Sequence, residues 1–246
     1  MKHKLPLFPI PETEKCQPND FFCTFFKEHE NDLAGCGPLQ PYPSGTEIFR
    51  EDALAEVVYL IERGIVKLNL IKLNGKETIV GLRTRYWLLA APSVFLGIPY
   101  SFTATTVTPC HLRPITAKCF FNVLETNEAF SREMYRLLSQ EIFSNLRKIE
   151  EVSSMSANER IRRFLHQLIT ELSPEKLQTH NHYQIPLKHR ELAEIVGVSS
   201  EHLCRVVKEL ERQGVLISTK GMLTIRDVSG LFPPTSDIGE TISLSD

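Results

Sequence analysis

One stretch near the C-terminus places polar and charged side chains at the spacing of a single helical face. Ser200, Glu201, Cys204, Arg205 and Lys208 would share that face, because a helix turns once every 3.6 residues. An arginine there can donate two hydrogen bonds to guanine O6 and N7, and a glutamate can accept one from the amino group of cytosine. The pattern therefore predicts that Glu201 and Arg205 read base edges. Because they are four residues apart, a plain surface ion pair is the alternative.

Further basic side chains around this face are expected to contact phosphates. They are Lys208, Arg212, Lys220 and His202. Such contacts set affinity and salt dependence, but they do not select a sequence. Ser199 or Ser200 is expected to cap the helix that carries the face, since serine is a preferred N-cap residue.

A helix-turn-helix at 187–213 would present these side chains. Ala193 is small where the two helices would cross, and Gly197 stands where the sharp turn needs a positive φ. The residues that follow predict a wing. Gly214 would end the second helix, and 215–217 and 222–225 would form a hairpin that turns at Lys220-Gly221. A helical hairpin inside an ordinary core is the alternative, but it does not account for the glycine, the capping serine and the wing together.

Residues 41–124 alternate short β-prone runs with turn signals. The runs are 47–49, 57–61, 64–71, 78–82, 101–107 and 111–115. Asn74-Gly75 between two of them is typical of a type I′ hairpin turn, which needs positive φ at both central residues. About eight strands at this spacing indicate a sandwich or jelly roll that would serve as a sensor domain.

Residues 125–154 are predicted to form one long helix with an apolar stripe. The stripe consists of Phe130, Met134, Leu137, Leu138, Ile142, Leu146 and Ile149. At ~1.5 Å per residue the helix is roughly 40 Å long, too long to be covered by one small sandwich. We therefore expect it to pair with a second copy of itself in a parallel dimer. Packing on its own barrel alone is the alternative.

The remaining segments complete an α+β fold. Residues 1–40 are expected to be irregular, with a short helix that begins at Asn19 or Asp20 and ends at Gly35. A winged helix-turn-helix domain is expected over 155–232, and a disordered tail over 233–246.

The order of a β-roll, a long helix and a C-terminal winged helix resembles the Crp/Fnr family of transcription regulators. The resemblance spans about 41–231 and is most specific in 190–225, where Glu201-His202-Leu203-Cys204-Arg205 matches the family's recognition pattern. Residues 43–49 and 61–68 support it. It implies a cyclic-nucleotide-binding-like β jelly roll, a dimerisation helix and sequence-specific binding of a homodimer to double-stranded DNA with a two-fold symmetric operator. RNA polymerase is implied as a further partner.

This sequence departs from that family in two places. The cyclic-AMP receptor protein has an arginine just before the recognition glutamate, whereas this chain has Ser200, so a different outer base is expected in each half-site. Cyclic-nucleotide members carry a Gly-Glu-Leu turn and later an arginine for the cyclic phosphate. The corresponding positions here hold Leu-Ala-Ala at 89–91 and the pair Tyr100-Ser101. Without that arginine a buried phosphate would stay unpaired, so we expect no response to cAMP or cGMP.

The resemblance also suggests where a signal would bind. An effector pocket inside the roll would be lined by Trp87, Leu89, Tyr100 and Ser101, whose apolar surroundings suit a hydrophobic ligand, a planar cofactor or a filled pocket. Oxygen-sensing relatives hold an iron–sulfur cluster with N-terminal cysteines and one cysteine late in the barrel. By that resemblance the candidate ligands are Cys16, Cys23, Cys36 and Cys110, with Cys119 as a substitute for Cys110. Free buried thiols, haem on His111 or Cys110, a thiol switch and an effector-independent regulator are the alternatives.

Composition and motifs narrow the function classes. The chain has 246 residues with 42% hydrophobic and 24% charged residues, which is ordinary for a globular protein of two domains. We expect a cytosolic protein without membrane contact, because no apolar run nears the ~20 residues of a membrane span. No phosphate-cradling glycine-rich loop, HExxH or Gly-x-Ser-x-Gly motif is present, so we do not expect an enzyme. A redox protein whose winged helix binds only other proteins is the competing class.

Overall fold

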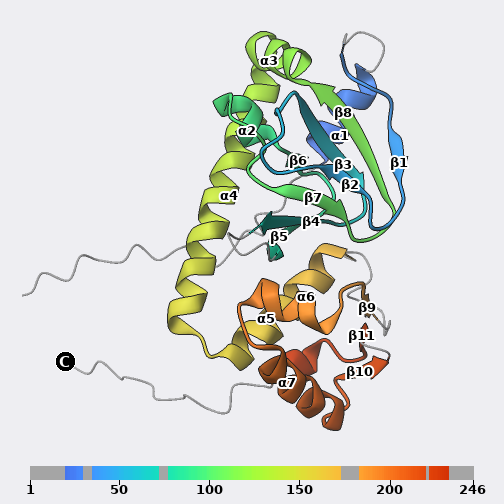
Figure 1. Cartoon of the computed structure of the whole chain (residues 1–246), viewed down its shortest axis with the longest axis vertical. Coiled ribbons are helices and arrows are strands. Elements are labelled where there is room, and N and C mark those ends of the chain that lie inside the picture. The colour runs from blue at the N-terminus through green and yellow to red at the C-terminus, as the bar shows by residue number, and fades with distance from the viewer. Residues whose placement is uncertain (1–19, 30–34, 72–76, 173–182, 220–221, 233–246) are drawn as a thin grey trace, which may run out of the picture.

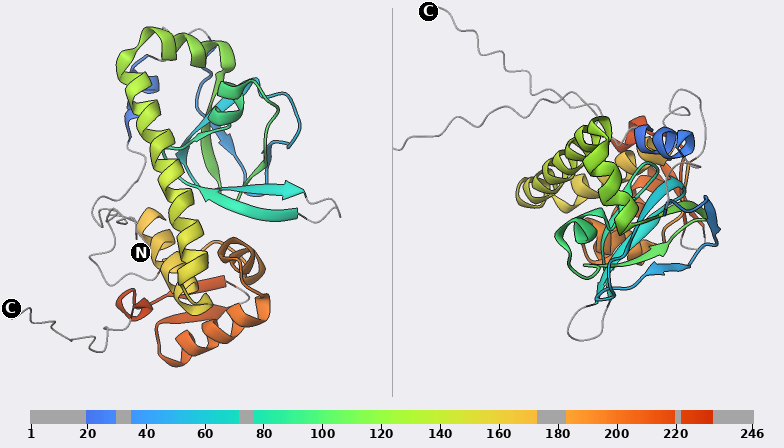
Figure 2. Two further views of the ribbon diagram at one scale, coloured as in Figure 1. Left: turned by 90° about the vertical axis from the view of Figure 1, so that its left-hand side faces the viewer. Right: turned by 90° about the horizontal axis from the view of Figure 1, so that it is seen from above.

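The computed structural model describes residues 20–29, 35–71, 77–172, 183–219 and 222–232 (Figure 1). The predictions for 1–19 and 233–246, the two hairpin turns at 74–75 and 220–221, and the positions of Cys16 and Lys220 lie outside these residues. The smaller C-terminal domain lies below the β-roll in Figure 1, and one long helix runs down from the roll to this domain (Figures 1 and 2).

The β-roll is built from two four-stranded antiparallel sheets. The first sheet has the strand order β1 (Gln40–Tyr42), β8 (Cys110–Thr116), β3 (Val57–Arg63) and β6 (Leu88–Leu89). The second has the order β2 (Glu47–Phe49), β7 (Thr103–Thr106), β4 (Val66–Ile71) and β5 (Glu77–Arg83). The six predicted runs are all found as strands, whereas β1 and β6 were not predicted. Both are short, and their pairing partners lie far away in the sequence.

Each face of the first sheet contributes to a different core. On β3, Tyr59 and Ile61 contribute to the core between the two sheets, while Val58 and Leu60 belong to a core formed with the surrounding helices. The reason is that successive side chains on a strand point to opposite faces. Helix α2 (Ala91–Leu96), which follows β6, buries Ala91 and Val94 in the helix-side core.

The short N-terminal helix α1 spans Phe21–Glu28, so the prediction that it ends at Gly35 is wrong. The chain leaves the helix at His29, whose N–H still donates to the carbonyl of Phe25. Phe22 and Phe26 are almost fully buried, and their rings meet Phe130 edge to face. Tertiary burial of this aromatic face therefore limits the helix, although glycine at 35 is a good stop signal.

The long helix α4 spans Glu128–Ser154, and a separate helix α3 (Ala117–Thr126) precedes it. The prediction of one helix starting at residue 125 is wrong because Asn127 interrupts the helix there. Its backbone is extended, with φ −123° and ψ 102°. Its side-chain oxygen accepts a hydrogen bond from the N–H of Phe130 at 2.9 Å, which starts a new helix.

Helix α4 buries apolar side chains against the β-roll only along its first half, although Glu141 and Lys148 further along make polar contacts with Arg83 and Val80 of β5. Its buried side chains are Phe130, Met134 and Leu137. Beyond them it exposes large apolar side chains, namely Ile142, Phe143, Leu146, Ile149 and Val152. Figure 2 shows this half running past the β-roll toward the C-terminal domain.

The C-terminal domain packs three helices on a small sheet. Its elements are α5 (Ala157–Leu172), β9 (Tyr183–Ile185), α6 (His189–Val196), α7 (Ser200–Arg212), β10 (Leu216–Thr219), β11 (Met222–Ile225) and the short 3-10 helix η1 (Ser229–Leu231). Strand β9, which was not predicted, pairs with β11 and extends the predicted hairpin to three strands. Ile79 of β5 is buried in this domain's core, so the two domains share apolar contacts. In no described range is a helix both long and apolar enough to cross a membrane.

Candidate nucleic-acid interface

Helices α6 and α7 form the predicted helix-turn-helix, and a glycine makes the turn between them. Gly197 has φ 72° and ψ 44°, the left-handed conformation that only glycine adopts without strain. The N–H of Val198 then bonds back to the carbonyl of Ala193 at 2.9 Å, which closes the end of α6. Ala193 is 1% exposed, as a small residue at a close helix crossing should be.

Ser199 begins α7, which decides between the two predicted caps. Its Oγ accepts a hydrogen bond from the N–H of His202 at 3.1 Å. The buried side of α7 carries Leu203, Val206, Val207 and Leu210, which join the core of the domain. The helix is therefore held by one face, and its opposite face is available for a partner.

The other face of α7 carries the predicted DNA-contacting residues. Ser200, Glu201, Arg205, Lys208 and Arg212 are exposed, and Cys204 and His202 are half-buried.

The expected alternative for Glu201 and Arg205 was an ion pair between them. Within the described residues no such pair forms: the guanidinium Nη2 of Arg205 lies 3.4 Å from Nδ1 of His202 instead. Arg212 at the end of the helix pairs with Glu209 at 2.9 Å. The Glu201 carboxylate and the Arg205 guanidinium, which were predicted to read bases, thus do not form an ion pair with each other.

The wing stands next to α7. Gly214, with φ 75°, leads from α7 into β10, and β10 pairs with β11 from Leu216 opposite Ile225 to Thr219 opposite Met222. The N–H of Ser218 donates to Glu211 of α7 at 2.6 Å, which ties the wing to the helix.

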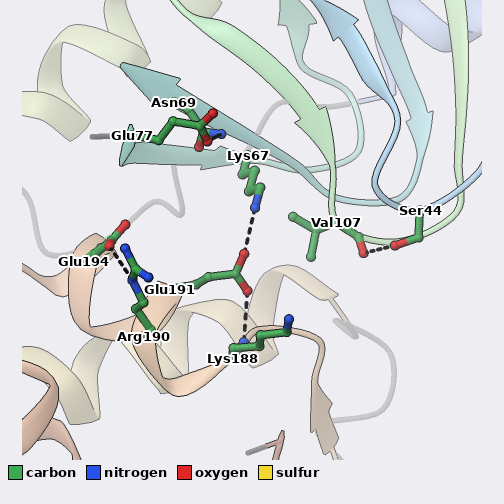
Figure 3. A network of polar contacts seen from close by, with 9 residues as sticks. All are labelled: Ser44, Lys67, Asn69, Glu77, Val107, Lys188, Arg190, Glu191 and Glu194. Atoms are coloured by element: carbon green, nitrogen blue, oxygen red, sulfur yellow. Dashed lines mark hydrogen bonds and ion pairs between the residues drawn. The ribbon is translucent and has the colours of Figure 1, made fainter. Parts of the chain in front are cut away.

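The β-roll contacts α6 through a half-buried ion pair (Figure 3). Nζ of Lys67 on β4 lies 2.7 Å from Oε1 of Glu191, and Oε2 of Glu191 accepts from the N–H of Lys188 at 3.0 Å. Burial by itself raises the pKa of Glu191. These two hydrogen bonds and the charges of both lysines outweigh that effect, so its pKa lies below the usual value. Glu191 three residues after Lys188 has the spacing of a capping box, but nothing local in the sequence pointed to Lys67.

The predicted effector residues border the interior of the roll, except for Ser101. Leu89 is buried in the core between the sheets, and Trp87 packs at its edge with the guanidinium of Arg83 4.8 Å from the ring centroid. Ser101 instead lies beside Ser93 of α2, with their hydroxyl oxygens 3.3 Å apart.

Tyr100, which the sequence predicts in place of the phosphate-binding arginine of cyclic-nucleotide members, has its polar group satisfied within the roll. Its hydroxyl donates to the carbonyl of Val57 at 3.0 Å, and its ring stacks on Phe49 with centroids 4.2 Å apart. Phe49 in turn stacks on Tyr59, whose pKa is raised to about 12 by burial and by its phenolic neighbours. A neutral aromatic stack therefore occupies this side of the roll.

The structure does not bring the described members of the predicted cysteine set together. Cys110 lies in the core between the sheets, whereas Cys23 and Cys36 pack against the helix-side core across the first sheet. Among the described residues no group of three or more His, Cys, Asp or Glu is placed to hold a metal ion.

The chemistry of the thiols agrees with their burial. Burial raises the pKa of Cys23 to about 12, and it also raises the pKa values of Cys110 and of the proposed substitute Cys119. Burial thus favours the neutral thiol form of all three cysteines in the described structure. The haem candidate His111 follows Cys110 on β8, where alternation turns it away from the roll's interior.

Comparison with known proteins gives two matched domains. Residues 39–127 match the model of the cyclic nucleotide-binding domain, and residues 159–232 match that of the Crp-like helix-turn-helix domain. The CRP-like protein Clp of Xanthomonas campestris pv. campestris is 26% identical over 181 residues, which cover 71% of this chain and 78% of Clp.

Solved structures share the fold at lower identity. FixK2 from Bradyrhizobium japonicum matches with a TM-score of 0.66 and 19% identity, over 79% of this chain and 94% of its own. The structure described as the c-di-GMP responsive global regulator CLP of Xanthomonas campestris matches with a TM-score of 0.62 and 23% identity, over 80% and 96%. A CRP/FNR family transcriptional regulator from Thermus thermophilus matches with a TM-score of 0.65 and 21% identity, over 79% of this chain and 96% of its own.

Proposed function

The chain belongs to the Crp/Fnr family of transcription regulators, and from that premise we propose that it binds a two-fold symmetric operator as a homodimer, independently of cAMP. The exposed polar face of α7 is the observation that carries the proposal. Arg205 and Glu201 read bases there, and they are available because no ion pair joins them within the described residues. Lys208 and Arg212 contact phosphates, and Ser200 and Cys204 line the same face. Lys220, which lies outside the described residues, is a further proposed phosphate contact.

The apolar stripe on the second half of α4 supports the dimer. Ile142, Leu146 and Ile149 are each more than half exposed, and Tyr135 continues the same line of residues seven positions before Ile142. Isolated surface leucines are ordinary, but a stripe at helical spacing marks a helix partner. Pairing two copies of α4 in parallel would set the two α7 helices about one turn of DNA apart.

The stacked Tyr100 supports independence from cAMP. A cyclic phosphate bound there would have to displace a satisfied tyrosine, and the Tyr100 side chain offers no positive charge to neutralise it. In this proposal the protein acts in the cytosol on DNA, with RNA polymerase as its further partner on the strength of the family resemblance. The described thiols give no support to an iron–sulfur sensor.

Selection from a randomised double-stranded DNA pool, followed by fluorescence anisotropy on the selected site, tests the proposal. Wild type should select a palindrome. Arg205→Ala should lower the affinity for that site by at least about thirtyfold, because each dimer loses two bidentate base contacts worth about 1–3 kcal/mol each. Arg132→Ala, an equal truncation at an exposed position on α4, is the matched control and should bind as wild type does. Equal binding by the Arg205→Ala protein would rule out base reading by this residue.

Sedimentation analysis tests the dimer separately. Leu146→Glu places a charge in the apolar stripe and should shift the protein to monomer and weaken operator binding. Ser144→Glu adds the same charge on the opposite side of α4, where the residue is exposed, and should leave the dimer intact. A Leu146→Glu protein that stays dimeric would refute pairing through α4.

Operator affinity measured with and without nucleotide tests the effector statement. Millimolar cAMP should leave the affinity unchanged. Because the Clp structure is described as c-di-GMP responsive, that dinucleotide is the second compound to titrate. A cAMP-dependent gain in affinity would contradict the role assigned to Tyr100.

A further inference from the structure

His202 lies next to the arginine that is proposed to read a base. Its backbone N–H is fixed by the Ser199 cap, and its Nδ1 lies 3.4 Å from Nη2 of Arg205 one turn further along α7. A guanidinium carries only donors, so Nδ1 must accept this hydrogen bond. The ring proton is therefore on Nε2.

That tautomer leaves Nε2 in an unfavourable place. The atom is buried and has no hydrogen-bond partner in the part of the chain that the structure describes. An unpaired buried donor costs free energy, and an apolar ring of similar shape would avoid that cost. Histidine at 202 is therefore not explained by stability, whereas its contact with Arg205 needs an acceptor at the Nδ1 position.

We propose that His202 is a positioning residue that orients the guanidinium of Arg205 for a base. This inference rests on the proposed function. In many helices a glutamate four residues before an arginine would pair with it. Here His202 takes the guanidinium, and the carboxylate of Glu201 stays available for the opposite base of the pair or a neighbouring one. In this proposal the histidine contacts neither a base nor a phosphate. The positioning role takes the place of the phosphate contact that the sequence predicts for His202.

Two substitutions separate these roles. His202→Phe keeps a planar ring but has no acceptor, and His202→Asn keeps an acceptor oxygen near the Nδ1 position. Both are compared with wild type and Arg205→Ala on the selected operator, on operators changed at one base pair at a time, and over a range of salt concentrations.

We expect His202→Phe to melt no lower than wild type, because the unpaired donor is removed. Its affinity for the selected operator should fall about tenfold, and its preference should flatten at the same base pair as in Arg205→Ala. Its salt dependence should match that of wild type, and His202→Asn should recover most of the preference.

Other outcomes overturn the inference. A uniform loss on all operators, with a salt slope lower by about two (one for each His202 of the dimer), would make His202 a phosphate contact. If His202→Phe keeps the base preference of wild type, the acceptor at Nδ1 does not matter. The same conclusion follows if His202→Asn loses that preference as fully as His202→Phe does. A lower melting temperature for His202→Phe would mean that the ring nitrogens of His202 stabilise the fold, and stability would then explain the histidine. If wild type selects no sequence at all, the proposed function itself fails, and that result is distinct from each of these.

Discussion

At the scale of single residues, burial separates the groups that can do chemistry from those that cannot. The thiols of Cys110 and Cys119 are almost fully buried, and Cys23 packs beside the aromatic side chains of α1. Desolvation favours the neutral thiol in each case, so these groups are poor nucleophiles near neutral pH. The charged groups on α7 that are predicted to contact DNA, in contrast, are exposed to solvent.

Alkylation measures this difference directly. With its pKa raised to about 12, Cys23 should carry about a thousandfold less thiolate at pH ~8 than a free cysteine, and it should react with iodoacetamide correspondingly slowly. Cys204, half-buried on α7, is the internal reference in the same digest. Peptide mass spectrometry over time gives both rates. Modification of Cys23 as fast as Cys204 in the native protein would contradict the burial of its thiol.

At the scale of elements, a few backbone positions set the geometry of the interface. Gly197 turns α6 into α7, Ser199 starts α7, and Gly214 turns α7 into the wing. None of these three acts through a side chain in the core. Each fixes the direction in which an element leaves the previous one, and so fixes where the exposed face of α7 points.

Substitution at Gly197 tests the turn. A Cβ built there meets no atom within 4 Å, so Gly197→Ala introduces no clash and is opposed only by the positive φ. The free energy of unfolding should fall by about 1–2 kcal/mol. Gly197→Asn should cost less, because asparagine tolerates the left-handed conformation better. Urea denaturation of the three proteins gives the order, and an alanine variant as stable as wild type would show that the turn can adopt another conformation.

At the scale of the whole molecule, the β-roll and the DNA-binding domain are physically joined. Ile79 of β5 is buried among the side chains of the C-terminal domain, and Lys67 reaches across to Glu191. The strands of the roll thereby contact the first helix of the helix-turn-helix directly, in addition to the covalent path through α4 and α5. A change in the position of β4 or β5 would therefore alter the contacts that these strands make with α6 and the C-terminal domain.

The pH dependence of stability reports this contact. The pKa of Glu191 is lowered in the folded state, so its ion pair stabilises the fold above the ordinary value of 4.5, and that contribution is lost as pH falls through the lower folded value. Glu191→Gln should therefore be less stable than wild type near neutral pH, and the two should converge in acid. Glu194→Gln removes a pair with the exposed Arg190 and should have a smaller effect. A constant difference between wild type and Glu191→Gln at all pH values would contradict the ion pair.

The features that the sequence by itself determined are those with a local physical cause. A left-handed glycine, a capping serine and alternating β-prone runs specify their own conformation, so the helix-turn-helix, the wing and most strands were predictable. Only the tertiary structure decided the rest, because it depends on contacts between residues far apart in the chain. It ended α1 before Gly35, added β9 to the wing, placed Cys23 and Cys110 in different cores and joined Lys67 to Glu191. It also placed the guanidinium of Arg205 against His202 and not against Glu201. Spacing alone leaves the choice between these two neighbours on one helix open.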